Sequence, residues 1–548
     1  MKEISINEVK IMLHSAVRQL EADKDLLDSL NVFPVPDGDT GTNMFMTIST
    51  AEHEIKNSDT NEMDQLMHSF AYGALRGAHG NSGVILSQIF KGLSDIFSDY
   101  KKITSKIFAQ ALVRATDVAY AAVKIPKEGT ILTVIRYMAE QSKSLAIRYS
   151  SVETFLKEVV QKGEEILAKT PEMLPILKQA GVVDAGGRGL ISVFTGMLKG
   201  LLGEEIVGTK PQEENIPVAE AMNLTADTND AIINCLGEIK YGYCTEYFVI
   251  QIKDTVTEED ISRLRDRLST IGDSVICIGD LSLIKVHVHT NQPNRALNFA
   301  LQLGEIDKIK IENMREQNRV IRRKIASTPK KEMALMTICV GEGIKNIFKE
   351  LGVSQIVEGG QTMNPSVEDI LSSIQRINSD NIIIMPNNKN IIMAAQQAKE
   401  LSEKNIEIIP TINVLQGIKA VLAFDDELTF KDNIKNMNKT YKDIIYGQVT
   451  HAVRKTKIDG LSLEEGDIIG LDDKKILTKG SDVDQVVIDL IDALKDEDSE
   501  IITLYYGDKV TKEQAEELKK KIENKYKDFE VIVNAGGQPH YFYFLSIE

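Results

Sequence analysis

Apolar residues recur every three to four positions through the first 200 residues, which is the period of a helix with one buried face. The pattern begins with Val9, Met12, Leu13, Ala16, Val17 and Leu20. The same spacing predicts further helices over about 41–55, 62–76, 81–97, 104–123, 129–147, 152–168 and after 189. The connections are short, so consecutive helices should be antiparallel neighbours. Residues 6–203 are therefore expected to form an all-α domain of eight helices.

The pattern changes after an acidic, proline-punctuated linker at residues 204–230. Residues 231–323 combine short strands with two helices and should form a small α+β domain. Its strands are predicted near 243–252, 274–278 and 282–289. Residues 332–548 alternate Ile- and Val-rich strands with helices, which predicts an α/β domain around a largely parallel sheet. The expected fold class is a multidomain chain of these three parts.

Four of the predicted helix starts carry unusual loops. In an up-and-down bundle the second, fourth, sixth and eighth helices begin at the same end. Their starts hold the segments 36–43, 79–83, 126–130 and 184–189, which are rich in Gly, Asp, Ser and Thr. Helix N-termini point a positive dipole outward and attract anions. One such loop is typical of a plain turn, but four at one rim predict an anion site with a bound metal.

The first of these loops places two carboxylates around a glycine. Asp37 and Asp39 lie two positions apart and can point the same way, because Gly38 lets the backbone turn tightly. Hard oxygen ligands on a loop suit Mg²⁺, which shares its shell with water and substrate phosphates. Thr42 and Asn43 then open a helix whose free N–H groups attract phosphate. The alternative is a Pro-Asp-Gly turn that only caps a helix.

A second candidate site lies in the α+β domain. His287 and His289 alternate with valines along a predicted strand, so both lie on one face. Cys244, on another strand, could supply a third ligand of a zinc site with a fourth position left open. From the residues alone, two packed or surface histidines are the simpler interpretation.

Composition and charge argue against several kinds of binding partner and cellular location for this protein. The net charge of -17 argues against a general nucleic-acid surface or an anionic membrane as partner. No apolar run approaches the roughly 20 residues that span a bilayer, and the start has no apolar signal-peptide core. The four cysteines are too few and scattered for a disulfide framework. We expect a cytoplasmic protein without a transmembrane segment.

Three motifs together resemble a known family. They are Pro-Asp-Gly-Asp-Thr-Gly-Thr-Asn-Met, Gly-Asn-Ser-Gly and Asp-Ala-Gly-Gly-Arg-Gly. Over residues 6–202 they resemble the ATP-binding subunit of dihydroxyacetone kinases, and above all the N-terminal domain of bacterial fatty acid kinase catalytic subunits. The resemblance implies an eight-helix barrel that holds ATP and Mg²⁺ at one end, with Asp37 and Asp39 as metal ligands. The dihydroxyacetone kinases carry a third aspartate just upstream, where this chain offers Asn31 instead.

The same resemblance implies roles for the other helix starts. Asn81, Ser82 and Gly83 would hold phosphates, Thr130 would line the nucleotide pocket, and Asp184, Gly186 and Gly187 would belong to a loop folded over the nucleotide. Arg188 would lie near the phosphates and join Asp37 and Asp39 in the catalytic set, unless it is a surface charge at a helix start. His79 either contacts phosphate or caps a turn. The resemblance also favours zinc at Cys244, His287 and His289.

Residues 332–548 resemble the C-terminal domain of the same kinases, which is similar to the lipid-binding DegV-type fold. The resemblance rests on the segments 357–365, 413–417 and 536–539. A partner-docking or regulatory role is expected, and the alternative is that these segments are only tight turns of the sheet.

The resemblance implies an ATP-dependent kinase that phosphorylates the carboxylate of a fatty acid held by a separate fatty-acid-binding protein, giving an acyl phosphate for phospholipid synthesis. Two other functions stay open: a kinase for a small hydroxy-ketone such as dihydroxyacetone, and a nucleotide-sensing regulatory protein without turnover. The expected partners are ATP and the carrier protein, with a second copy of the chain as an open alternative.

Overall fold

The structure is a computed structural model. It describes the chain except for residues 32–37, 57–59, 124, 205, 207–239, 280, 317–318, 321–328, 360–363, 453–455, 459–460, 473–474 and 498. Asp37, nearly all of the predicted linker at 204–230 and part of the segment 357–365 therefore lie outside the described residues. The chain divides into two compact units. One comprises residues 1–209, 332–371 and 380–548, and the other comprises residues 210–331 and 372–379.

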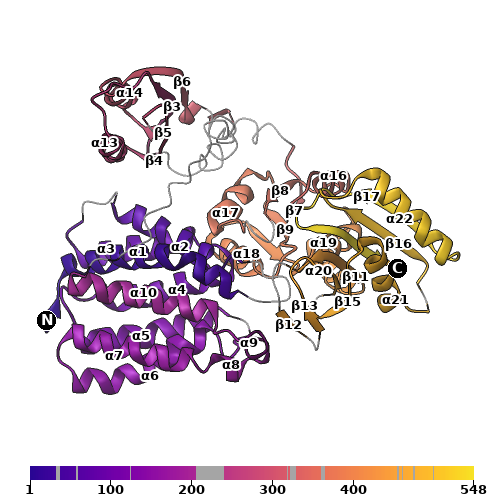
Figure 1. Cartoon of the computed structure of the whole chain (residues 1–548), viewed down its shortest axis with the longest axis horizontal. Coiled ribbons are helices and arrows are strands. Elements are labelled where there is room, and N and C mark those ends of the chain that lie inside the picture. The colour runs from indigo at the N-terminus through magenta and orange to yellow at the C-terminus, as the bar shows by residue number, and fades with distance from the viewer. Residues whose placement is uncertain are drawn as a thin grey trace. The chain divides into compact units, whose positions relative to one another are not determined.

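The N-terminal part is helical, as predicted (Figure 1). Its long helices are α1 (Ile6–Leu30), α2 (Thr40–Lys56), α3 (Met63–Arg76), α4 (Gly80–Phe97), α5 (Ser105–Ala121), α6 (Ile131–Arg148), α7 (Val152–Leu167) and α10 (Ala185–Leu202). Two short helices, α8 (Thr170–Met173) and α9 (Pro175–Ala180), lead into α10, and strands β1 (Glu3–Ile4) and β2 (Ile103–Thr104) pair near the N-terminus. Each long helix packs against the next, and α10 packs back against α1. One apolar core, including Leu20, Ile48, Phe90 and Phe194, fills the space between them.

The start of α10 corrects a prediction. The segment 184–189 was expected to be a loop before the helix, but the helix already begins at Ala185, and Asp184 is its N-cap. The glycines serve close packing between helices. A β-carbon on Gly187 would lie 2.8 Å from Val134 of α6, and one on Gly189 would lie 2.5 Å from the Met44 sulfur of α2. Separations this short are steric overlaps, so a side chain at either position would force Val134 or Met44 to shift, although the backbone is helical.

Residues 240–316 form the expected α+β unit. Its elements are β3 (Tyr243–Ile250), α13 (Glu258–Ser269), β4 (Gly272–Gly279), β5 (Ile284–Thr290), α14 (Pro293–Leu301) and β6 (Glu305–Asn313). The strands form one antiparallel sheet in the order β4-β5-β3-β6. Tyr247, Val286 and Val288 point to a core shared with the two helices. Strand β6 was not predicted; most of its side chains are exposed.

The described residues of 332–548 form two larger sheets with covering helices and a separate two-stranded antiparallel sheet. The first part comprises β7 (Met333–Cys339), α16 (Glu342–Glu350), β8 (Gln355–Glu358), α17 (Val367–Arg376), β9 (Asn381–Met385), α18 (Ile392–Leu401) and β10 (Asn405–Ile408). Its sheet is parallel, in the order β10-β9-β7-β8, as the strand–helix alternation predicts. Helices α19 (Val414–Leu422) and α20 (Phe430–Thr440) then lead to the second sheet.

The second sheet shows that the prediction of a largely parallel sheet was wrong for this half. Its part of the chain comprises β11 (Ile445–His451), β12 (Thr456–Ile458), β13 (Leu461–Leu463), β14 (Ile468–Leu471), β15 (Ile476–Gly480), α21 (Val483–Leu494), β16 (Ile501–Tyr506), α22 (Lys512–Lys525), β17 (Glu530–Ala535) and β18 (Tyr541–Ile547). In the order β15-β14-β11-β18-β16-β17, only β16 and β17 are parallel. Helix α22 joins that pair, whereas β14 and β15 follow each other closely, and a short connection permits only antiparallel pairing.

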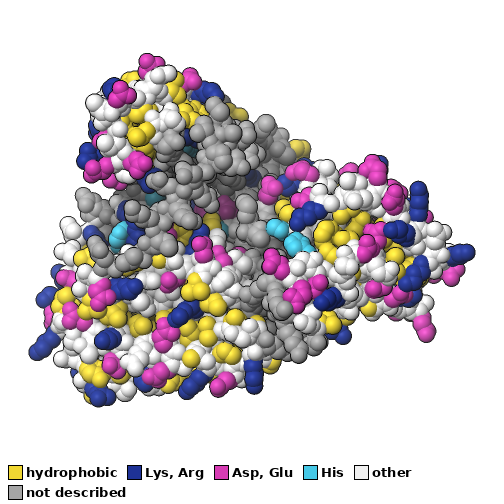
Figure 2. Space-filling model, viewed as in Figure 1, with side chains coloured by type: hydrophobic (Ala, Val, Ile, Leu, Met, Phe, Trp, Pro, Cys, Tyr) yellow, Lys and Arg dark blue, Asp and Glu magenta, His cyan; other side chains and the backbone are white. Residues whose placement is uncertain are grey.

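Charged side chains of both signs are interspersed on the face of the molecule in Figure 2. No helix among the described residues is long and apolar enough to cross a membrane.

Candidate functional site

The starts of α2, α4, α6 and α10 lie side by side. A β-carbon on Gly80, at the start of α4, would lie 2.6 Å from the Asn43 side chain of α2. The overlaps of Gly189 with Met44 and of Gly187 with Val134 join the start of α10 to those of α2 and α6. Glycines thus bring the four predicted segments together at one end of the helical part.

Asp39 lies buried among these helix starts, with 5% of its surface exposed. Its partners are side-chain amides. Asn31 donates from Nδ2 to Oδ1 over 3.2 Å, Asn364 donates from Nδ2 to Oδ2 over 2.6 Å, and Asn43 also donates. Burial raises the pKa of Asp39 to about 6, although the bonds from Asn43 and Asn364 favour the charged form. A buried carboxylate whose described hydrogen-bond partners are amides, with the Asp28 charge also acting on it, fits a hard cation, which would supply positive charge.

Asp28, near the end of α1, is a residue that sequence reasoning missed. Its Oδ1 accepts from the backbone N–H groups of Gly41 at 2.6 Å and Thr42 at 3.1 Å, and its Oδ2 accepts from the Thr42 hydroxyl at 2.7 Å. The first amides of α2, which we predicted to be open to phosphate, are therefore capped by a carboxylate. No local pattern signals this, because donor and acceptor come from different helices.

The start of α4 holds the predicted phosphate-binding residues. Gly80 has a positive φ of 55°, and Asn81, Ser82 and Gly83 occupy the first turn of the helix. Asn81 donates from Nδ2 to Asn390 Oδ1 over 3.2 Å, while its own Oδ1 is buried and has no partner in the described part of the chain. A β-carbon on Gly83 would overlap the Thr47 hydroxyl of α2. The turn thus presents one unpaired amide oxygen close to the buried site.

His79 precedes this turn and is 9% exposed. Its backbone N–H donates to the Thr47 hydroxyl over 3.2 Å, and its Nδ1 bonds to the Gly77 carbonyl at 2.7 Å. Burial lowers the pKa of His79, so the ring is neutral and its Nδ1 is the donor. These contacts shape the turn and leave phosphate contact by His79 as a prediction.

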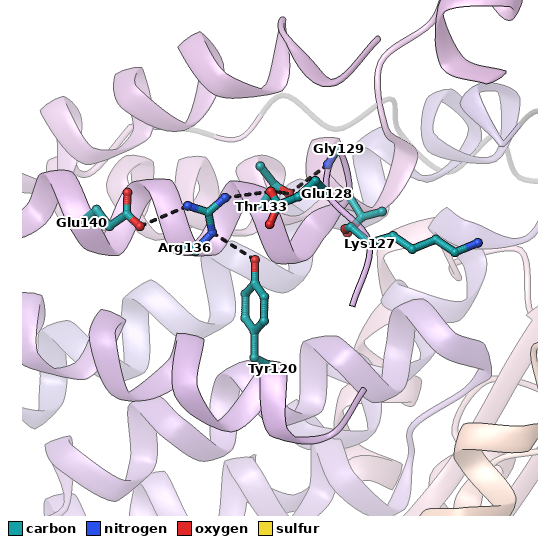
Figure 3. A network of polar contacts seen from close by, with 8 residues as sticks. Tyr120, Lys127, Glu128, Gly129, Thr133, Arg136 and Glu140 are labelled. Carbon is teal, nitrogen blue, oxygen red and sulfur yellow. Dashed lines mark hydrogen bonds and ion pairs between the residues drawn. The ribbon is translucent and has the colours of Figure 1, made fainter. Parts of the chain in front are cut away.

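A polar network braces the turn before α6 (Figure 3). The Arg136 guanidinium bonds to Glu128 at 2.7 Å, Glu140 at 3.1 Å and the Tyr120 hydroxyl at 3.1 Å. Thr133 donates to Glu128 over 2.7 Å. Within the turn, the Thr130 hydroxyl donates to the Lys127 carbonyl over 2.8 Å. Thr130, predicted to line the nucleotide pocket, therefore lies on a turn fixed from α5 and α6.

At the start of α10, the Asp184 carboxylate accepts from the Gly187 N–H over 2.7 Å and also from the backbone of Ile131. Burial raises the pKa of Asp184 to about 6. Gly186 and Gly187 pack against α6, and Arg188 pairs with Glu164 of α7 at 2.6 Å. In this arrangement Arg188 serves as a surface ion pair, and its place near phosphate stays a prediction.

The raised pKa of Asp184 predicts a pH-dependent stability. A carboxyl whose folded pKa exceeds its unfolded value stabilises the fold below about pH 4, and this contribution is lost as the pH rises through about 6. Asp184→Asn keeps an acceptor for the cap without the charge. At pH 8 we expect its free energy of unfolding to exceed that of the parent by about 1–2 kcal/mol. Denaturant unfolding at pH 4 and pH 8 measures the difference, and an equal gap at both pH values would contradict the assignment.

The second candidate site lies on the sheet of the α+β unit. The ligand atoms of Cys244, His287 and His289 lie within 4.8 Å of one another, and all three residues are buried. The three side chains meet because Cys244 on β3 is paired with His289 on β5. They lie on the face of the sheet away from the apolar core. His289 Nε2 is buried and has no hydrogen-bond partner among the residues that the structure describes. An unpaired ring nitrogen beside a thiol and a second imidazole fits the three-ligand set of a zinc site.

Two acids at this cluster were not predicted. Glu246 lies 2.8 Å from His287 Nδ1, and Asp273 lies 3.6 Å from His289 Nδ1. Carboxylates in this position orient metal-binding imidazoles. Glu246 follows Cys244 by two residues on the same strand face, so alternation would have revealed it. Burial, followed by the neighbouring His287, lowers the pKa of His289 to about 4 and keeps the ring neutral, as a metal ligand must be.

Comparison with known proteins identifies the class to which this fold and site belong. A DAK2 domain matches residues 34–199. The FakA-like middle and C-terminal domains of fatty acid kinases match residues 240–321 and 334–548. The chain therefore carries kinase-family domains along most of its length.

Whole-length relatives identify the family. The chain is 40% identical over 546 residues to protein YloV of Bacillus subtilis (strain 168), covering 98% of both chains. It is 39% identical over 544 residues to an uncharacterized protein of Staphylococcus aureus (strain USA300), again covering 98% of both. The chain belongs to the FakA-like family of fatty acid kinase proteins.

Among solved structures, the Fak B3 protein of Streptococcus pneumoniae loaded with linoleic acid aligns with 39% of this chain and 99% of its own. The TM-score is 0.28 and the identity is 11%, and a likeness this low carries no conclusion about this chain.

Proposed function

We propose that this chain is the ATP-dependent component of a fatty acid kinase, in which an eight-helix barrel transfers phosphate to a fatty acid presented by a separate fatty-acid-binding protein. The observation that carries the proposal is the buried Asp39 carboxylate, whose partners among the described residues are amides, where four helix starts meet. Membership of the FakA-like family supports the choice of acceptor.

The residues of the chain suit phosphoryl transfer, which depends on positioning and charge neutralisation. Asp39, with Asp37 and Asn31, would hold Mg²⁺, which would offset the charge of the ATP phosphates when bound. The first turn of α4 would hold phosphate oxygens through Asn81 and Ser82. The fatty acid carboxylate is already a nucleophile, so no strong base is needed. Its oxygen attacks the γ-phosphorus, the bond to the ADP oxygen breaks, and an acyl phosphate forms.

We propose a zinc ion as a further component. Cys244, His287 and His289 would bind it in the α+β unit, with Glu246 and Asp273 orienting the imidazoles. When bound, zinc would tie strands β3 and β5 together through side chains on one face of the sheet.

The experiment that tests the proposal measures ATP consumption by the purified full chain with Mg²⁺. The acceptor is varied among none, dihydroxyacetone, and a fatty-acid-binding protein loaded with a long-chain fatty acid. We expect consumption only with the loaded carrier, and trapping with hydroxylamine should yield the hydroxamate of an acyl phosphate. Consumption with dihydroxyacetone alone would support the small-molecule kinase instead. ATP binding without turnover under any condition would support the nucleotide-sensing protein.

A further inference from the structure

The segment Asn364–Asp369, which leads into α17 and forms its first turn, packs directly on the Asp39 site. Asn364 is 5% exposed, and its side chain ends at the Asp39 carboxylate. The Val367 N–H donates to the Ala78 carbonyl over 3.1 Å, and Ser366 forms an antiparallel bridge with His79. The turn that leads into the phosphate-binding start of α4 is therefore bonded, backbone to backbone, to the C-terminal part of the chain.

Contacts on both sides hold this segment in place. Arg76, at the end of α3, forms a two-pronged ion pair with Glu368, with N–O distances of 2.6 and 2.5 Å. Beyond the site, Asn81 bonds to Asn390, and Gln88 of α4 bonds to Gln397 of α18 at 3.0 Å. Helix α18 packs along α4. The contact is a specific surface with hydrogen bonds, an ion pair and helix packing.

The bond to Asp39 is chemically incompatible with a metal in the same place. Asn364 presents an N–H group to Oδ2, and an N–H group cannot ligate a cation. Asn31 presents another N–H group to Oδ1, so its amide would have to turn over before its oxygen could ligate the proposed metal. Turning the Asn364 amide over would direct its oxygen at the carboxylate, which repels it, so the donor orientation is the stable one when no cation is bound. Asn364 and Mg²⁺ therefore compete for Oδ2.

The closed contact also carries a cost. Among the described residues, no hydrogen-bond partner reaches the buried Oδ1 atoms of Asn364 and Asn81. An unsatisfied buried oxygen destabilises the arrangement that buries it. The contact therefore combines many favourable bonds with two destabilising oxygens. A tightly bound ligand can then provide enough free energy to open it.

We propose that Asn364–Asp369 is an intramolecular cap that competes with Mg²⁺ and nucleotide for the Asp39 site and keeps the kinase closed when they are absent. The proposal rests on the proposed function, because it assumes that Asp39 holds the metal. In this proposal, binding of Mg²⁺ and nucleotide disfavours docking of Asn364–Asp369, and docking disfavours their binding. Any change that undocks the segment therefore raises the affinity for Mg²⁺ and nucleotide.

The test measures binding of Mg²⁺ with a non-hydrolysable ATP analogue to the full chain by calorimetry. Glu368→Arg places two cations together and should open the cap, and Asn364→Ala removes the competing donor. We expect each variant to bind the analogue about 10-fold more tightly than the parent. Arg76→Glu should have the same effect, and combining it with Glu368→Arg re-forms the ion pair and should restore the parent affinity.

Matched controls replace residues of the same types elsewhere in the C-terminal part. Glu350→Arg changes an exposed end of α16, and Asn405→Ala removes an amide bonded to Asn381 at the edge of the parallel sheet. Both should bind the analogue as the parent does.

Two results would overturn the cap. Unchanged affinity in both Glu368→Arg and Asn364→Ala would show that the segment does not compete. Lower affinity would show that Asn364 helps to hold the ligand. Failure of the proposed function itself looks different, because Asp39→Ala would then bind Mg²⁺ and the analogue as the parent does.

Discussion

Asp39→Ala is expected to lower the Mg²⁺- and ATP-dependent turnover of the full chain by at least about 100-fold, the scale of losing one preorganised charge-stabilising group. The carboxylate is buried at the meeting of four helix starts, and its described partners are neutral amides. Without it, Mg²⁺ would lose a charged ligand in a place where water cannot substitute. Kinetic assay with the loaded carrier measures the loss.

The thermal midpoint of Asp39→Ala distinguishes loss of the metal ligand from unfolding of the protein. Removing a buried carboxylate that lacks a cationic partner relieves a desolvation cost, so the thermal midpoint of Asp39→Ala should not fall. Asp99→Ala, at an exposed position after α4, is the control and should keep full turnover. Turnover and nucleotide affinity in Asp39→Ala equal to those of the parent would remove the metal assignment.

Cys244→Ser is expected to abolish zinc binding. The purified parent should contain about one zinc per chain and the variant close to none. A site with three protein ligands loses most of its zinc affinity when one is removed, and a hydroxyl does not replace a thiolate. The α+β unit should also unfold at lower temperature, since metal binding free energy is folding free energy in small sites. Metal analysis by mass spectrometry, together with thermal unfolding, measures both effects.

The chain offers a closely matched control for this prediction. Cys277 is also buried in the same sheet, but it belongs to the apolar core under α13 and α14, away from the histidines. Cys277→Ala should keep its zinc. Parent protein that purifies and refolds without zinc would contradict the site, and so would a Cys244→Ser variant that keeps it.

Local patterns in the sequence predicted most of the helices and the parallel sheet. Helix α1 has an apolar period, and strands β7 and β9 are apolar runs. Burial of each element produces these patterns, so a window of ten to fifteen residues contains the signal. Alternation along β5 likewise placed His287 and His289 on one face, and the structure brings Cys244 to them.

Contacts between distant segments could not be predicted in this way. Asp28 caps α2 and Asn364 reaches Asp39 only because separate helices and domains pack together. Nothing near either residue in the sequence signals its partner. The antiparallel second sheet escaped prediction for a related reason, because strand order depends on which strands meet and not on their own composition.

The glycines at the helix starts have a consequence for mutational data. Gly83, Gly187 and Gly189 set the spacing of the rim, because their missing β-carbons are what let neighbouring helices touch. A side chain there would overlap Thr47, Val134 or Met44 and force the neighbouring helix surface to shift. In a mutational scan these positions would look as sensitive as catalytic residues, and lost activity would report on the width of the site as well as on contact with a ligand.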